Sequence, residues 1–171
     1  MQFGDILALA GLRADGRKYD EIRRLSYKLG GNLQSDGSAY VEQGLNKVLV
    51  SVTGPAEPAR RAADSSDDKG RISCHLLNTP FSGPDWRKRR TGDRKTHELE
   101  AIIVNTFEAA VMLESYPKSQ IDISIDILES DGSLLCTMIN GVTLALMDAG
   151  VAMTDMICSC SCGNNIYTDI Y

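Results

Sequence analysis

The densest run of charge in the chain is the segment 86–95, which reads WRKRRTGDRK. Six of its residues are basic and one is acidic, so the segment carries +5 and the other 161 residues together carry −10. A basic segment on an acidic body favours contact with a polyanion, because guanidinium groups match phosphate oxygens in pairs. Trp86 either stacks on a base or anchors the loop. A solvated surface loop or a localisation signal is the alternative interpretation of this segment.

A weaker basic pair, Arg60 and Arg61, lies within AEPARRAADSSDDKG at residues 56–70. Apolar residues do not recur there at helical or strand spacing, so the stretch predicts an exposed loop. A loop of this kind is usually only a connection, and the composition alone does not give the pair a binding role.

A possible anion site is the turn at Asp131, Gly132 and Ser133, which leads directly into an apolar segment. Backbone N–H groups at the start of a helix attract phosphate, and an Arg or Lys with a hydroxyl would complete the site. Ser133 offers a hydroxyl, but Leu134 and Leu135 offer neither hydroxyl nor charge. An ordinary strand-to-helix turn is therefore favoured.

The sequence contains no recognisable catalytic or metal-binding constellation. His75 and His97 are the only histidines and lie far apart, and no nucleophile elbow, P-loop, HExxH or dinucleotide fingerprint is present. His97 is expected to be a surface or capping residue. The alternating Cys158, Cys160 and Cys162 suit a thiol metal site less well than free thiols, because zinc ligands usually stand further apart. We predict no catalytic residue, metal or cofactor.

Length and composition fit one globular domain or a small domain with an appendage. The chain has 171 residues, 43% of them hydrophobic and 24% charged, which excludes disordered, collagen-like, mucin-like and coiled-coil classes. Five cysteines argue against a disulfide scaffold. The first residues lack the basic start of a secretory signal, and no run reaches the roughly 18 apolar residues of a membrane span. We therefore expect a soluble, intracellular protein.

The elements that must position these residues form an alternation of strands and helices. The hairpin expected at 39–52 turns at Gly44-Leu45-Asn46 and closes at Gly54-Pro55, whereas 20–33 is ambiguous. Further expected elements are a strand at 72–77, a helix capped by Thr96 and ended by 115–117, a strand at 120–128, a helix at 135–147 and a strand at 156–162. This order predicts an α+β or layered α/β fold, with two helices on one face of a sheet.

Four segments together resemble the ribonuclease PH family. They are GLRADGR (11–17), SDGSAYVEQGLNKVLVSVTGPAEP (35–58), GDRKTHELE (92–100) and the stretch 116–153. Each segment is weak alone, but the four occur in order over nearly the whole chain. The resemblance implies a ribonuclease PH-like βαβα fold (ribosomal protein S5 domain 2-like), a mixed sheet of four strands with the helices packed on one face. It also implies that residues 1–171 form a single domain without the family's C-terminal part.

Within the family, the residues look most similar to the ring subunits of the eukaryotic RNA exosome. The resemblance implies a six-membered ring whose central channel admits single-stranded RNA. Family members either phosphorolyse RNA from its 3′ end or thread it toward an attached hydrolytic exoribonuclease, in rRNA maturation and mRNA turnover. The implied partners are other ring subunits of the ribonuclease PH type, cap subunits and that nuclease. The implied locations are nucleus, nucleolus and cytoplasm, with no membrane contact.

The resemblance also assigns residues. Active relatives hold phosphate with a Gly-Thr-Arg element, and the matching positions here are Ser133, Leu134 and Leu135, so the phosphate site is expected to be degenerate. Arg94 and Lys95 match a basic pair that faces the channel in relatives, and Arg60 and Arg61 fall in the loop that narrows its entrance. These four are the predicted RNA-binding residues. A non-catalytic, RNA-threading subunit is the main expectation, with an active phosphorolytic exoribonuclease and a purely structural ring module as alternatives.

Overall fold

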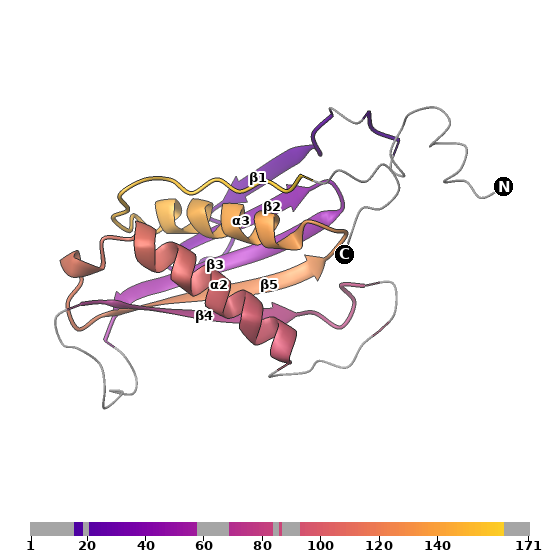
Figure 1. The fold of residues 1–171 in the computed structure, drawn as a ribbon. Coiled ribbons are helices and arrows are strands. Elements are labelled where there is room, and N and C mark those ends of the chain that lie inside the picture. The colour runs from indigo at the N-terminus through magenta and orange to yellow at the C-terminus, as the bar shows by residue number, and fades with distance from the viewer. Residues whose placement is uncertain (1–15, 19–20, 58–68, 84–85, 87–92, 163–171) are drawn as a thin grey trace.

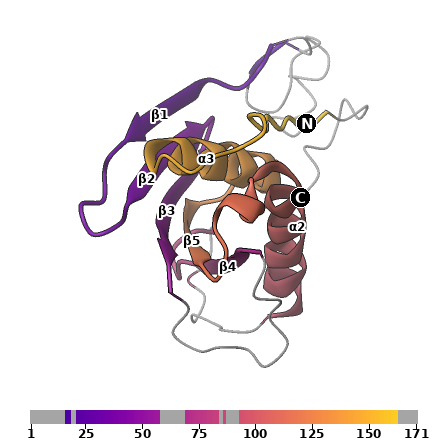
Figure 2. The ribbon, with the colours of Figure 1, turned by 90° about the vertical axis from the view of Figure 1, so that its left-hand side faces the viewer.

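The structure is a computed structural model that describes residues 16–18, 21–57, 69–83, 86 and 93–162. Within these residues, five strands form one sheet in the order β1-β2-β3-β5-β4, and two helices cover one of its faces (Figures 1 and 2). The elements are β1 (Leu25–Leu29), β2 (Gly37–Gln43), β3 (Asn46–Ala56), β4 (Arg71–Asn78), α2 (Arg94–Ala110), the 3-10 turn η1 (Leu113–Ser115), β5 (Gln120–Glu129) and α3 (Leu134–Asp148). The predicted α+β class is confirmed.

The sheet is mixed. Neighbouring strands run antiparallel except β4 and β5, which run parallel and are joined through α2. Because each parallel strand is followed by a helix, both helices begin at the carboxyl ends of these strands. That end lies toward the right of Figure 1. Topology thus brings two helix N-termini, far apart in the sequence, to the same end of the sheet.

The core lies between the sheet and the helices. Ile121, Ile123, Ile125 and Ile127 of β5 are at most 1% exposed, as their alternation predicts. The other fully buried large residues are Val41, Val48, Val50, Val52, Ile103, Phe107, Met138 and Leu146. Gly141 lets α3 approach β3, since a Cβ there would lie 2.9 Å from Val50 Cγ2. Sheet and helices are therefore in direct contact over one apolar layer.

Two expectations about β1 and β3 need correction. The sheet has five strands rather than four, because β1 forms in the stretch 20–33 that the sequence left ambiguous. β3 does not end at Gly54-Pro55 but continues through this cis peptide to Ala56, with a shift of register against β5. β4 and β5 confirm the strands predicted at 72–77 and 120–128, with slightly wider bounds.

The predicted strand at 156–162 is wrong. This segment is extended but pairs with no strand among the described residues, and it lies along α3 instead. Asn140 donates from Nδ2 to Ser159 O at 2.9 Å and accepts from Ser159 N at 2.8 Å, and Thr143 donates to Ile157 O at 2.8 Å. Exposed and half-buried residues do alternate in this segment, but the half-buried side faces α3 and not a neighbouring strand. This contact also explains why α3 is apolar nearly all round.

Helix α2 differs from its prediction at both ends. It begins at Arg94 after the N-cap Asp93, which makes no side-chain capping bond, so Thr96 lies inside the helix and does not cap it. It ends at Ala110, earlier than the predicted 115–117, because Val111 leaves the helix to form a β-bridge with Met153. In the part of the chain that the structure describes, neither helix has the length and apolar character that crossing a membrane requires.

Candidate functional site

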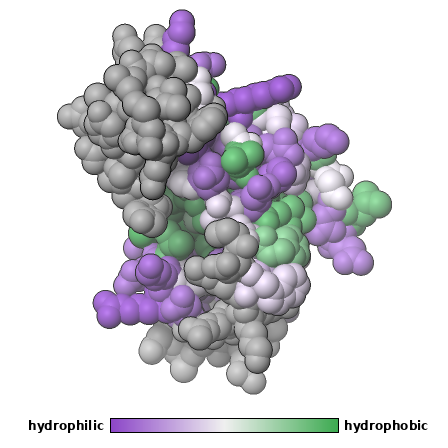
Figure 3. Space-filling view, turned by 90° about the vertical axis from the view of Figure 1, so that its right-hand side faces the viewer, coloured by the Kyte–Doolittle hydropathy of each residue, from purple (hydrophilic) through white to green (hydrophobic). Residues whose placement is uncertain are grey.

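The candidate site is the end of the sheet where β4 and β5 finish and both helices begin. Figure 3 looks onto this end, where hydrophilic side chains surround smaller hydrophobic patches. The features assembled there are the start of α2 with Arg94 and Lys95, and the 131–133 turn that leads into α3. In α/β sheets, ligands commonly bind at the carboxyl ends of parallel strands. The geometry of this end therefore decides what chemistry the chain can offer.

The 131–133 turn has an unusual backbone. Gly132 and Ser133 both have left-handed φ angles, 62° and 59°. Glycine adopts this conformation freely, whereas it costs a residue with a Cβ roughly 1–2 kcal/mol. Ser133 occupies the N-cap position of α3 but makes no side-chain capping hydrogen bond. The first N–H groups of α3 are therefore not satisfied by the cap side chain.

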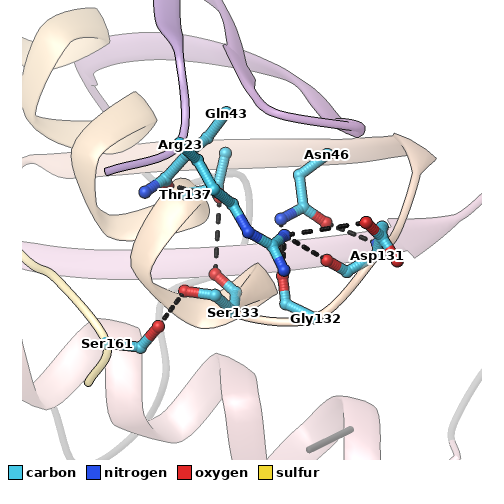
Figure 4. Close-up of polar contacts among 8 residues, drawn as sticks. All are labelled: Arg23, Gln43, Asn46, Asp131, Gly132, Ser133, Thr137 and Ser161. Atoms are coloured by element: carbon cyan, nitrogen blue, oxygen red, sulfur yellow. Dashed lines mark hydrogen bonds and ion pairs between the residues drawn. The ribbon is translucent and has the colours of Figure 1, made fainter. Parts of the chain in front are cut away.

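Two side chains from distant parts of the chain hold this turn in place (Figure 4). Asn46, fully buried at the start of β3, donates from Nδ2 to Gly132 O at 2.5 Å and accepts from Asp131 N at 2.6 Å. Arg23 donates from Nη1 to the carbonyls of Asp131 and Gly132, and lies 3.8 Å from the Asp131 carboxylate. The turn is thus fixed by residues about 85 to 110 positions away in the sequence.

The first turn of α3 is attached on two further sides. Thr137, fully buried, donates to Gln43 Oε1 at 2.9 Å, which ties the helix to the end of β2. The Ser133 hydroxyl lies 2.5 Å from the Ser161 hydroxyl of the C-terminal segment (Figure 4). Its hydroxyl is therefore directed to a neighbouring chain segment rather than to the N–H groups of its own helix.

The two residues after the 131–133 turn, Leu134 and Leu135, carry no charge. Leu134 and Leu135 are half-buried and pack against the hydrophobic core. Arg23 is the cation observed at this turn, and its guanidinium is engaged by the two carbonyls and by Asp131. The turn offers backbone N–H groups to an anion, but Leu134 and Leu135 supply it with neither hydroxyl nor cation.

The start of α2 presents its cations to solvent. The Arg94 side chain is 92% exposed and pairs with Glu98, Nε to Oε1 at 3.0 Å, and Lys95 is exposed. A pair this exposed contributes less than about 1 kcal/mol to stability, so Arg94 is available to an external anion at little cost. His97 is a surface residue, as expected, with Nδ1 2.9 Å from Glu100 Oε2.

Glu100 is a structural residue that the sequence analysis missed. Its Oε1 accepts from Leu76 N on the edge strand β4 at 2.9 Å, while Oε2 contacts His97. The carboxylate thus satisfies a backbone donor on the open side of the sheet and fixes α2 against β4. The only sequence signal for this role is that Glu100 lies six positions after Arg94, the first residue of α2.

The predicted site residues do not all lie together. Arg94 and Lys95 lie at the same end of the sheet as Ser133, Leu134 and Leu135. Arg60 and Arg61 fall outside the described residues, as does the 87–90 part of the basic segment. The strand ends that border residues 58–68, the end of β3 and the start of β4, lie at the opposite end of the sheet.

The cysteines do not form a metal centre in the described part of the chain, where no group of three or more potential ligands converges. Cys158, Cys160 and Cys162 are free and exposed, and Cys74 and Cys136 are free and buried. Burial, with a smaller contribution from the charge of Glu100, raises the pKa of the Cys74 thiol to about 12. Cys74 is therefore an inert core residue rather than a nucleophile.

Comparison with known proteins adds relatives of similar sequence and fold. A family model described as "3' exoribonuclease family, domain 1" matches residues 21–152. The exosome complex component RRP41 of Homo sapiens is 39% identical over 159 residues, which are 93% of this chain and 65% of the relative. The exosome complex component ski6 of Schizosaccharomyces pombe is 36% identical over 170 residues, 99% of this chain and 69% of the relative.

Among solved structures, the crystal structure of Rrp46 from rice matches with a TM-score of 0.72 at 26% identity, covering 84% of this chain and 64% of that chain. This chain therefore spans about two thirds of the length of these relatives. The family model covers all five strands of the sheet, both helices and the 131–133 turn. The chain therefore belongs to the 3′ exoribonuclease family of ribonuclease PH type, and residues 21–152 correspond to its domain 1.

Proposed function

We propose that this chain acts as a core ring subunit of the RNA exosome, which binds and threads single-stranded RNA but does not itself cut it. The relatives named as exosome components support the assembly, because they align with 93–99% of this chain. The structural similarity to Rrp46 supports membership in the same type of ring. The proposed partners are other ring subunits of the ribonuclease PH type, the cap subunits and an attached hydrolytic exoribonuclease, in nucleus, nucleolus and cytoplasm.

The observation that carries the non-catalytic role is the start of α3. Where active relatives have Gly-Thr-Arg, this chain has Ser133, Leu134 and Leu135. Ser133 adopts the left-handed backbone conformation that glycine favours. The hydroxyl and the guanidinium of that Thr-Arg pair are absent at Leu134 and Leu135. Each charge-assisted hydrogen bond to phosphate contributes about 1.5–3 kcal/mol. The attacking phosphate would therefore bind at least tenfold more weakly.

The proposed RNA path uses both ends of the sheet. Arg94 and Lys95 stand exposed where β4 finishes, and the segment with Arg60 and Arg61 connects strand ends at the other end. β3 has 11 residues and runs roughly 36 Å between these ends. An RNA strand that follows the sheet would meet the exposed cations of Arg94 and Lys95 at one end, and the segment with Arg60 and Arg61 is proposed as a second contact. Binding through phosphates alone is independent of sequence and weakens as salt rises.

The test is RNA degradation by the reconstituted complex without its hydrolytic nuclease, in the presence and absence of inorganic phosphate. We expect no phosphate-dependent shortening and no release of nucleoside diphosphates. The family is described as 3′ exoribonucleases, so phosphorolysis is a possible outcome, and observing it would refute the proposal.

The variant Leu135→Ala would then show which subunit is active. The activity should stay unchanged if another subunit performs the reaction.

A matched pair of charge reversals tests the RNA path. Lys95→Glu at the start of α2 should weaken RNA binding by the complex, while Lys28→Glu, an equal change at an exposed lysine of β1, should not. Reversing Arg60 and Arg61 should add to the effect of Lys95→Glu. Full RNA affinity after all these changes would favour a purely structural ring subunit.

A further inference from the structure

Two aromatic side chains stand in solvent in the connection between β4 and α2. Phe81 is 57% exposed and Trp86 is 75% exposed, whereas Phe107 in α2 is completely buried. Trp86 is the only tryptophan in the chain. Isolated exposed apolar residues are common and need no explanation. Two large rings in the one connection between β4 and α2, at the end of the sheet where α2 and α3 begin, are a more specific feature.

Phe81 is presented by a firmly attached turn. Thr79 donates to Ile127 O from its amide at 3.2 Å and from its hydroxyl at 2.7 Å. Ser82 N donates to Thr79 O at 3.1 Å, and Ser130 N donates to Ser82 O at 3.1 Å. Ser82 is 8% exposed. Thr79 and Ser82, which flank the pair Pro80-Phe81, are therefore attached to β5 and to Ser130 directly after it. A ring held this way loses little conformational freedom when a ligand stacks on it.

The charge next to Trp86 indicates the kind of ligand. Four basic residues follow it directly in the sequence at 87–90, and Arg94 and Lys95 begin α2. A ligand that satisfies both features needs negative charges and flat apolar surfaces at short intervals. Single-stranded nucleic acid has both, because its bases are unstacked and available to aromatic rings. An acidic peptide would use the cations but would leave the rings exposed.

We propose that Phe81 and Trp86 form a stacking platform for the bases of single-stranded RNA at this end of the sheet. The inference rests on the proposed function and adds a contact that phosphate binding does not provide. Stacking on an aromatic residue contributes about 1–3 kcal/mol per base. At 1.4 kcal/mol for each factor of ten, loss of one ring should weaken binding roughly 5- to 140-fold. The platform distinguishes single strands from duplexes, whose bases are already stacked.

The experiment uses the assembled complex and single-stranded RNA oligonucleotides, with a duplex of equal length for comparison. Trp86→Ala and Phe81→Ala should each weaken single-strand binding by the stated factor, and Trp86→Phe should retain most of it. Tyr27→Ala removes another exposed aromatic residue, 59% exposed on β1, and should have no effect. Subtracting the tryptophan emission of the Trp86→Phe complex isolates Trp86, whose fluorescence should be quenched by single strands only.

Salt dependence separates this inference from the proposed function. Trp86→Ala should lower affinity at every salt concentration without changing the slope of log affinity against log salt, whereas Lys95→Gln should reduce that slope by about one. RNA binding with an unquenched Trp86 and unchanged affinity of the alanine variants would overturn the platform but leave the proposed function intact. Equal binding and quenching by the duplex would also overturn it. Absence of any RNA binding would refute both.

Discussion

Asn46 offers the sharpest test of how the 131–133 turn is held. Its buried amide makes two short hydrogen bonds to backbone groups of this turn, at 2.5 and 2.6 Å. Asn46→Ala removes both bonds. Each is worth about 1 kcal/mol net, and the amide of Asp131 would be left without its Asn46 acceptor at a further cost of about 1–3 kcal/mol. Gly132 O retains Arg23, 3.3 Å away. These contributions add up to about 3–5 kcal/mol, so we expect a loss of stability of at least about 3 kcal/mol.

The assay is urea unfolding followed by circular dichroism, with thermal unfolding alongside it. For a chain of this size, about 3 kcal/mol corresponds to a fall in Tm of roughly 6–12 °C. Asn32→Ala is the matched control, because Asn32 also bonds through its side chain, to Ser51 Oγ at 3.1 Å, but at the opposite end of the sheet. Amide hydrogen exchange at Asp131 should accelerate in the Asn46 variant only. Equal stability losses in both variants, with Asp131 still protected, would refute this account of the turn.

Three further predictions concern two side chains with raised pKa values, Tyr40 and Cys74, and the carboxylate of Glu100. Burial and the hydrogen bond to Glu42 raise the pKa of Tyr40 to about 12, so the fold retains a proton that the unfolded chain releases near pH 10. Stability should decline between pH 10 and 12, and Tyr40→Phe should remove that slope in alkaline unfolding curves. The Cys74 thiol, with its pKa near 12, should stay unmodified by iodoacetamide at pH 8 while the three exposed cysteines near the C-terminus react, as mass spectrometry would show; equal labelling would contradict the burial argument. Glu100→Ala should cost about 1–3 kcal/mol because the amide of Leu76 loses its acceptor; an unchanged urea midpoint would show that water replaces the carboxylate.

The strongest local patterns predicted their elements well. β5 alternates isoleucine with polar residues, and a period of two places every isoleucine on the core side whatever the neighbours are. The hairpin of β2 and β3 was also predictable, because Gly44-Leu45 supplies a turn between two alternating runs. In both cases the physical cause acts within about ten residues, which a sequence displays directly.

Other features depended on partners that a sequence does not display. The segment 156–162 has the alternation of a strand, but its partner is α3, so its backbone bonds to Asn140 and Thr143 instead of a ladder. β1 was ambiguous because Leu25, Tyr27 and Leu29 remain partly exposed at the edge of the sheet. Residue types alone cannot tell an edge strand from a loop in such a case.

The candidate site divides in the same way. The sequence by itself determined the basic character of the 86–95 segment and the lack of charge at Leu134 and Leu135, since these are properties of residue types. Only the tertiary structure decided that both helix N-termini meet at one end of the sheet, because that follows from the parallel pairing of β4 with β5. It also decided that Asn46 holds the 131–133 turn, through hydrogen bonds spanning about 85 residues, a separation at which no local pattern carries information.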